Sequence, residues 1–248
     1  AKPSMQELNI APHHLINIKD PIEYYSAAQF CTDAISLCDA IFSKGKIPLL
    51  VGGTMMYFRI LQQGLATLPT ADPALRTAMQ IEAEQLGWGA LHAKLAVVDP
   101  VAAQRIHPND SQRIQRALEV FMLSGKTLSE WQAEDTNALA RFRIFNIAIA
   151  PAERKVLHER IALRFAEMLK LGFVEEVQAL RTRGDLSVEL PSIRSVGYRQ
   201  MWEYLDGGVT FEVMTEKAIA ATRQLAKRQL TWLRSWPEIH WLETESPG

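Results

Sequence analysis

The stretch Ile47-Pro48-Leu49-Leu50-Val51-Gly52-Gly53-Thr54 decides the fold class. A short continuous apolar run ends at two glycines, and a helical pattern of apolar residues follows from Tyr57. Such a run is typical of a strand buried in a parallel sheet. Before it, residues 25–43 repeat apolar side chains at helical spacing and end at Lys44-Gly45-Lys46, a helix stop signal. Helix, strand, glycine turn and helix in this order predict an α/β layer.

A second apolar run, Ile144 to Ala150, predicts another buried strand. The segment between the two runs is too long for a simple crossover, and it is helical and charged. We therefore predict a helical insertion over residues 70–138, within an α/β core made of residues 1–69 and 139–248. The helices expected in the insertion are residues 73–86, 88–95, 100–105 and 110–123. From Pro151 onward the pattern is helical nearly to the end.

The composition is that of an ordinary globular protein with nearly balanced charge. The 248 residues include 27 Lys and Arg, 28 Asp and Glu, and two cysteines, with 48% hydrophobic residues. No stretch reaches the roughly 20 apolar residues that cross a bilayer, and the first residues lack the apolar core of a signal peptide. We expect a cytoplasmic protein that does not enter a membrane. Cys31 and Cys38 lie two helical turns apart, too far for a disulfide, and are read as core residues in a reducing compartment.

Gly125-Lys126-Thr127 resembles the tail of a phosphate-binding loop. That motif needs another glycine five places earlier, where this chain has Val120 inside a predicted helix. A glycine cap ending that helix is the favoured interpretation, so the sequence contains no phosphate loop. The Gly52-Gly53-Thr54 turn stands where ligands bind in open α/β sheets, although its spacing alone favours a purely structural turn. The histidines show no metal-ligand spacing, and we identify no metal-binding residues.

Four basic elements leave two interpretations open. Arg160 and Arg164 share one helix face and suit a diphosphate, or simply solvate the helix. Near the carboxyl terminus, cations alternate with tryptophans, a composition that binds nucleic-acid backbone and stacks on unpaired bases. Arg113 and Arg116, and the segment Arg194 to Arg199, add cations far away in sequence. An RNA groove follows if the fold brings the last three elements to one face, and only solvated helix sides follow otherwise.

Taken together, these segments resemble the bacterial tRNA dimethylallyltransferases, also called tRNA isopentenyltransferases. The matching runs span nearly the whole chain in order. They are Tyr25-Ser26-Ala27-Ala28, Pro48-Leu49-Leu50-Val51-Gly52-Gly53-Thr54, Asp99-Pro100-Val101-Ala102-Ala103, Ile106-His107-Pro108-Asn109-Asp110, Arg116-Ala117-Leu118-Glu119-Val120, Leu190-Pro191-Ser192-Ile193-Arg194-Ser195-Val196-Gly197-Tyr198-Arg199-Gln200-Met201-Trp202 and Thr222-Arg223-Gln224-Leu225-Ala226-Lys227-Arg228-Gln229.

The resemblance implies a nucleotide-binding (ATP-binding) α/β core of the P-loop type with a parallel sheet, a helical insertion that grips the tRNA anticodon stem-loop, and a helix-rich carboxyl-terminal part. The enzymes of this family transfer a dimethylallyl group from dimethylallyl diphosphate to the exocyclic amine of the adenosine on the 3′ side of the anticodon. The adenosine must be flipped out, because a stacked base cannot present its amine in line with the leaving group. Mg²⁺ is implied as the ion that assists departure of the diphosphate, and a monomer is the expected state.

The resemblance also implies roles for individual residues. Arg164 would contact the diphosphate, Thr54 and Arg76 would contact the tRNA, and Gly52 and Gly53 would form a turn near the substrate channel. The remaining tRNA contacts would be Gln112, Arg113, Ile114, Gln115, Arg116, Arg194, Ser195, Val196, Gly197, Tyr198, Arg199, Lys227, Arg228, Gln229, Leu230, Thr231, Trp232, Leu233 and Arg234.

The sequence departs from the family at its start. In the family, residues before the segment that matches Ala1-Lys2-Pro3 supply the first strand, the phosphate loop and an aspartate that is the general base. We expect the natural protein to carry them, because loss of a central strand would expose an edge of a parallel sheet. The 248 residues alone are expected to bind RNA poorly and to catalyse no transfer. Two rival functions are a prenyltransferase for free adenine nucleotides and a non-catalytic RNA-binding fragment.

Overall fold

A computed structural model describes residues 5–64, 68–133, 139 and 141–244. The chain divides into two compact units. The core unit combines Ala1–Met56 with Phe142–Gly248, and the helical unit is Tyr57–Arg141. The range 70–138, over which the sequence predicts a helical insertion, falls within the helical unit.

The helical unit is built around one apolar core. Its fully buried side chains include Leu91, Leu95 and Ile114. These residues recur at helical spacing, so each helix turns one apolar stripe inward. The described helices are α4 (Pro73–Leu86), α5 (Trp88–Val98), α6 (Pro100–Arg105), α7 (Ser111–Ser124) and α8 (Leu128–Ala133), and α3 (Met55–Gln63) precedes them.

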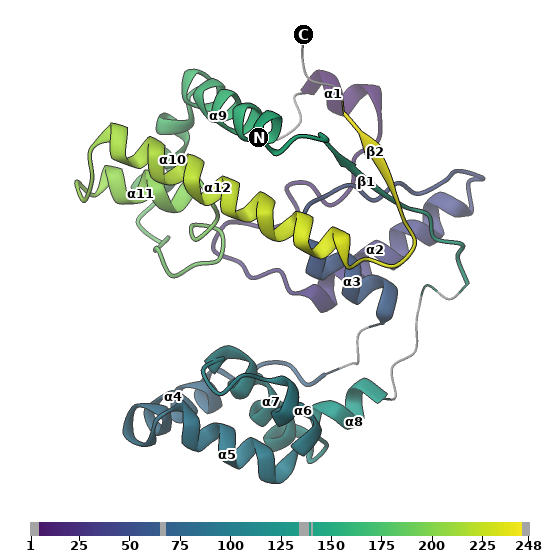
Figure 1. Cartoon of the computed structure of the whole chain (residues 1–248), viewed down its shortest axis with the longest axis vertical. Coiled ribbons are helices and arrows are strands. Elements are labelled where there is room, and N and C mark those ends of the chain that lie inside the picture. Colours follow the sequence, from purple (N-terminus) through teal and green to yellow (C-terminus); the bar gives the residue numbers. More distant parts are fainter. Residues whose placement is uncertain (1–4, 65–67, 134–138, 140, 245–248) are drawn as a thin grey trace. The chain divides into compact units, whose positions relative to one another are not determined.

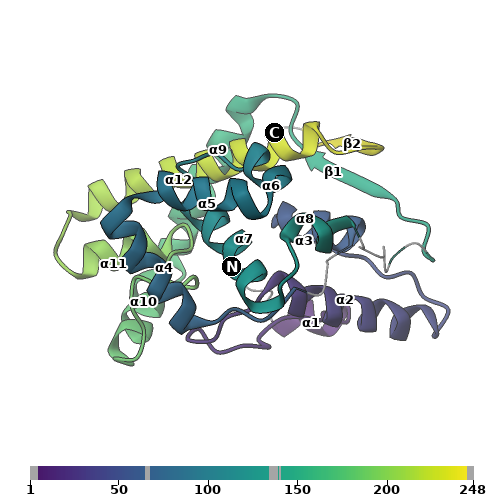
Figure 2. The ribbon, with the colours of Figure 1, turned by 90° about the horizontal axis from the view of Figure 1, so that it is seen from below.

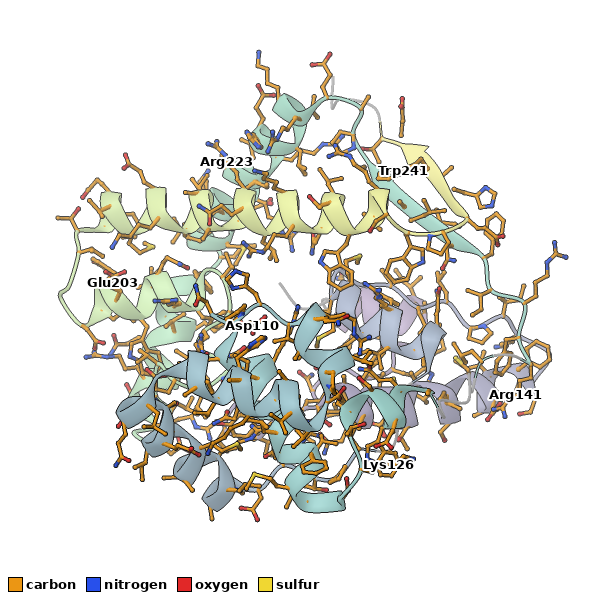
Figure 3. The ribbon with its side chains drawn as sticks, turned by 60° about the horizontal axis from the view of Figure 1, so that its bottom comes forward. Asp110, Lys126, Arg141, Glu203, Arg223 and Trp241 are labelled. Carbon is orange, nitrogen blue, oxygen red and sulfur yellow. The ribbon has the colours of Figure 1, made fainter. Side chains whose placement is uncertain are left out.

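Polar caps fix where these helices begin and end. Asp72 accepts hydrogen bonds from the first turn of α4, and Asp110 accepts one from Arg113 N at the start of α7. Gly125 ends α7 in the left-handed region, with φ +68°, and its N–H donates to Phe121 O. Gly125-Lys126-Thr127 is therefore a helix end, which confirms its interpretation as a glycine cap. Lys126, labelled in Figure 3, follows this cap with its ammonium group 4.3 Å from the centre of the Trp131 ring.

The core unit contains a two-stranded parallel sheet. Strand β1 (Asn146–Ala150) pairs with β2 (Ile239–Glu243), with Asn146 opposite Ile239 and Ala150 opposite Glu243. The strands lie side by side in both Figure 1 and Figure 2. The strand predicted over residues 144–150 is confirmed for its last five residues. Strand β2 was not predicted, because the sequence pattern after Pro151 indicates helices nearly to the end of the chain.

The strand predicted at Ile47–Val51 is wrong. These residues form no ladder, and the side chains of Ile47, Leu49 and Val51 are 90%, 81% and 84% exposed. A strand that is apolar on both faces is stable only when neighbouring strands and covering helices bury it. Among the described residues the single ladder is that of β1 and β2, and neither pairs with this segment.

Helices of the carboxyl-terminal half pack on one another. They surround a buried cluster that includes Phe165, Val177, Met201 and Met214. Gly172, with φ +93°, separates α9 (Arg154–Lys170) from α10 (Phe173–Thr182). The long α12 runs beside the others in Figure 1 and contacts α9 and α11. The elements are α9 (Arg154–Lys170), α10 (Phe173–Thr182), α11 (Tyr198–Leu205) and α12 (Phe211–Arg234).

The amino-terminal part of the core unit contains α1 (Met5–Ile10) and α2 (Ala27–Phe42). Ser26 and Gln29 form a reciprocal capping box at the start of α2. Cys31 and Cys38 on this helix are buried, as predicted, and they are not joined in a disulfide. Burial raises the pKa of Cys38. In the described part of the chain, no helix combines the length and apolar character needed to cross a membrane.

Candidate functional site

The glycine turn that precedes α3 is joined to α12. Gln229 donates from Nε2 to Gly53 O at 3.0 Å. A Cβ atom on Gly53 would lie 2.3 Å from that nitrogen, so only glycine permits this close approach without displacing Gln229. Thr54, the next residue, is exposed. The structure thus brings together two of the predicted site elements, the Gly52-Gly53-Thr54 turn and the basic end of α12.

The carboxyl-terminal half of α12 presents cations to solvent. Arg223, Lys227, Arg228 and Arg234 are all exposed, and Figure 3 shows Arg223 on this helix. Spacings of four and seven place Arg223, Lys227 and Arg234 along one stripe. This stripe offers positive charge to a polyanion over about three helical turns.

Other residues predicted to bind tRNA on α12 are less available. Leu230, Trp232 and Leu233 are half-buried. The hydroxyl of Thr231 donates to Lys227 O at 2.9 Å, within the helix itself. The cations of this segment are therefore better placed for a ligand than its apolar residues.

The segment Arg194 to Arg199 leads into α11. Arg194, Ser195 and Arg199 are exposed, whereas Val196 is half-buried. Gly197 has φ +93°, a backbone conformation that favours glycine, while a Cβ there would make only an ordinary contact of 3.5 Å with the Phe173 ring.

Tyr198 has a structural partner. Its ring packs edge-on against Phe173, and its hydroxyl donates to Glu176 Oε1 at 2.5 Å. Burial and this hydrogen bond raise the pKa of the phenol. The exposed Arg194 and Arg199 therefore remain as the cations that this segment offers to a ligand.

The structure separates the predicted pair of arginines on α9. Arg160 is half-buried and donates from Nη1 to the Thr244 hydroxyl at 2.7 Å, just after β2. Arg164 is exposed. Arg164 is thus the more exposed cation of the pair, whereas Arg160 contacts the segment that follows β2.

A buried carboxylate organises the arginines of the helical unit. Glu119 has a fully buried side chain and accepts hydrogen bonds from both Arg76 and Arg116. Burial by itself raises the pKa of Glu119, but the hydrogen bonds from Arg76, Arg116 and Asp72 N–H outweigh it and hold that pKa below its ordinary value. The same hydrogen bond raises the pKa of Arg76. All three side chains are therefore charged at neutral pH.

Residues 112–116 of α7 fall into two groups. Gln112 and Arg113 are exposed, and Arg113 pairs with Asp110 at 3.3 Å. Gln115 donates to Arg76 O at 3.1 Å. The prediction that Ile114 contacts tRNA is wrong for its side chain, which is completely buried in the core of the helical unit. An isoleucine on the inward stripe of an amphipathic helix packs, while its polar neighbours face solvent.

The sequence analysis missed Glu119. A glutamate between Leu118 and Val120, both buried, was the available signal, because a charge on an apolar stripe needs a partner. Among the described residues, no three His, Cys, Asp or Glu side chains gather closely enough to hold a metal ion.

Comparison with known proteins shows the family of the chain. A family model described as IPP transferase matches residues 1–236. The chain belongs to the IPP transferase family. This match confirms the resemblance drawn from the sequence.

Solved structures agree with membership of the IPP transferase family. The full-length tRNA isopentenylpyrophosphate transferase from Bacillus halodurans is 35% identical, with a TM-score of 0.66 over 98% of this chain and 75% of that one. The tRNA isopentenylpyrophosphate transferase from Staphylococcus epidermidis is 30% identical, with a TM-score of 0.61 over 97% and 78%. A eukaryotic dimethylallyltransferase acting on tRNA is 27% identical, with a TM-score of 0.80 over 98% and 62%. These likenesses confirm the predicted α/β fold class.

Proposed function

We propose that this IPP transferase moves a dimethylallyl group from dimethylallyl diphosphate to the exocyclic amine of the tRNA adenosine on the 3′ side of the anticodon. The match to the family model over residues 1–236 carries this proposal. Similarity to proteins described as tRNA isopentenylpyrophosphate transferases, at 35% and 30% identity, supports tRNA as the acceptor.

In this reaction a C–N bond forms as the C–O bond to the diphosphate breaks. The amine nitrogen attacks the first carbon of the allylic chain, diphosphate leaves with the electron pair of the C–O bond, and the amine then loses a proton to a base. Negative charge grows on the departing oxygen, so a nearby cation stabilises the transition state more than the bound substrate. We assign this role to Arg164, which is exposed on α9.

Binding of the RNA would use the exposed cations of both units. Arg194, Lys227 and Arg228 belong to the core unit, and Arg113 belongs to the helical unit. Each cation that neutralises a phosphate releases counterions, so binding should weaken steeply with salt. Thr54, held beside α12 by the hydrogen bond between Gly53 and Gln229, would contact the loop near the target base.

Four further features of the proposal rest on the family resemblance. They are a Mg²⁺ ion bound with the diphosphate, a nucleotide-binding (ATP-binding) core, a monomeric state and a cytoplasmic location. Prenyl transfer measured with and without a chelator would test the ion. Competition by ATP for the labelled diphosphate would test nucleotide binding, and the sedimentation of the purified protein would test the monomer.

The function is tested by transfer of radiolabelled dimethylallyl from its diphosphate to an anticodon stem-loop, with the protein at its natural full length. A stem-loop with guanosine at the target position is the control, and it should accept no label. Adding free AMP in large excess should leave transfer to the stem-loop unchanged. Label on AMP rather than on RNA would instead establish a prenyltransferase for free nucleotides, and binding of the stem-loop without any transfer would reduce the protein to an RNA-binding module.

A further inference from the structure

Glu119 holds two arginines with one carboxylate. Its Oε1 accepts from Arg76 Nε at 2.8 Å and from the backbone N–H of Asp72 at 3.0 Å. Its Oε2 accepts from Arg76 Nη2 at 3.0 Å and from Arg116 Nη1 at 2.6 Å. All four hydrogen bonds lie within the helical unit and reach a side chain with no exposed surface.

The same cluster fixes the segment that leads into α4. Arg116 donates from Nη2 to Pro69 O at 2.8 Å, in addition to the hydrogen bond from its Nη1 to Glu119. Gln115, next to it on α7, donates to Arg76 O. Hydrogen bonds thus join the start of α4 to α7, both through the backbone of α4 and through the side chain of Arg76.

The charges in this cluster do not cancel. Two guanidinium groups on one carboxylate leave a net positive charge, and the side chains of Arg76 and Arg116 are 43% and 29% exposed. The hydrogen bonds described for Arg76 occupy Nε and Nη2, which leaves Nη1 for an anion outside the protein. One arginine would be enough to neutralise the Glu119 carboxylate. The second arginine therefore adds a positive charge at the surface, and the carboxylate holds that charge in one orientation.

We propose that Glu119 is a positioning residue for RNA recognition, which fixes Arg76 and Arg116 so that their outer faces meet the phosphates of a folded stem-loop. This inference rests on the proposed function. It adds that the shape of the RNA, and not only its charge, is recognised here, because guanidinium groups held at a fixed spacing match only one arrangement of phosphates.

The test compares Glu119→Gln with Asp99→Asn. Glutamine keeps the size of Glu119 and removes the charge that orients both arginines. Asp99 is the other described buried carboxylate of the helical unit, and it accepts from Ala102 N and Ser129 N, with no hydrogen bond from an arginine. Binding is measured for an anticodon stem-loop and for an unstructured RNA of equal length, and NMR follows the Nε–H signal of Arg76 without RNA.

For Glu119→Gln we expect the preference for the stem-loop to fall about tenfold, the ratio that corresponds to one charge-assisted hydrogen bond. Affinity for the unstructured RNA should stay the same or rise, because both guanidinium charges remain and one negative charge is gone. The Arg76 signal should lose its protection from exchange. Asp99→Asn should lower stability and leave the preference and the Arg76 signal unchanged.

Equal weakening of both RNAs by Glu119→Gln, or a loss of preference in Asp99→Asn as large as in Glu119→Gln, would overturn the inference in favour of a structural role. A protected Arg76 signal that is lost in Glu119→Gln without any change in preference would overturn it as well. If the unaltered protein showed no preference for the stem-loop, that result would contradict the proposed function, and with it the inference that depends on that function. A stem-loop preference that is present in the unaltered protein and insensitive to Glu119→Gln contradicts the inference alone.

Discussion

The side-chain amide of Gln229 donates a hydrogen bond to the carbonyl oxygen of Gly53, although 176 positions separate the two residues. The basic helix α12 thereby holds the turn that carries Thr54. A displacement of this turn is expected to disturb catalysis more than stability, because the contact is a single hydrogen bond at an exposed position.

Gly53→Ala is expected to displace Gln229, because the added Cβ would lie 2.3 Å from its amide nitrogen. The end of a glutamine side chain moves easily, so we expect a loss of about 1 kcal/mol in the free energy of unfolding and a larger fall in prenyl transfer. Urea denaturation and transfer assays would be run on Gly53→Ala, Gln229→Ala and the double variant.

In the double variant the Gln229 side chain is absent, so the new Cβ at position 53 meets no clash. Adding Gly53→Ala to Gln229→Ala should therefore cost almost nothing in the free energy of unfolding. The two changes should therefore be coupled by about 1 kcal/mol. Strictly additive losses would show that Gln229 does not hold the turn.

Arg164→Ala is expected to lower kcat about a hundredfold while changing the Kd for the stem-loop less than about twofold, because the cation acts mainly on the departing diphosphate. Lys155→Ala is the matched control: it removes a positive charge from the same helix, where Lys155 lies 4.0 Å from Glu159. Single-turnover kinetics and filter binding would separate the two quantities. Parallel losses in rate and affinity would place Arg164 at the RNA instead.

Lys227→Ala is expected to weaken RNA binding for all sequences and to reduce the slope of log affinity against log salt by about one. Lys217→Ala provides the comparison, since Lys217 lies on the same helix and pairs with Glu203 at 2.7 Å. Glu203 is labelled on α11 in Figure 3. Titrations at several salt concentrations would measure both slopes, and a slope that Lys227→Ala leaves intact would remove this lysine from the interface.

The stability that Glu119 contributes should depend on pH. The pKa of Glu119 is lower in the folded chain than the ordinary value of 4.5. The ionised carboxylate therefore contributes its full stabilisation at pH values above 4.5. This stabilisation is lost as the pH falls through the lower pKa of the folded state. Glu119→Gln should therefore cost about 2 kcal/mol near pH 7, and this difference should shrink in acid. Urea denaturation of both proteins near neutral pH and near pH 3 would measure it, and a difference independent of pH would contradict the ion pairing.

Local signals in the sequence predicted the helices well. Asp110 and Gly125 mark the ends of α7 because a cap needs only hydrogen bonds between residues a few positions apart. Strand pairing depends on distant partners, so the exposed run at Ile47–Val51 was mistaken for a strand, and β2 was missed although Ile239, Trp241 and the preceding Pro237 are typical of a strand start.

In the candidate site, too, features that depend on neighbouring residues could be predicted, and features that depend on distant partners could not. The exposed cations of α12 could be read from their spacing, because one helix places them on one face. The cluster around Glu119 could not, because Arg76 lies 43 positions away and the carboxylate meets it only after α4 and α7 pack. Ile114 was included among the RNA contacts because the family resemblance covers the whole run from Gln112 to Arg116, while its own side chain completes the core.

The two buried thiols on α2 make this protein convenient for site-directed labelling. Cys31 and Cys38 are 6% and 7% exposed, and burial raises the pKa of Cys38, so maleimide reagents should react slowly with the native chain. If one cysteine were introduced on the outer face of each unit, these two residues would react with a fluorophore while Cys31 and Cys38 stayed largely unlabelled. Energy transfer between such a pair would measure the distance between the two labels with and without RNA.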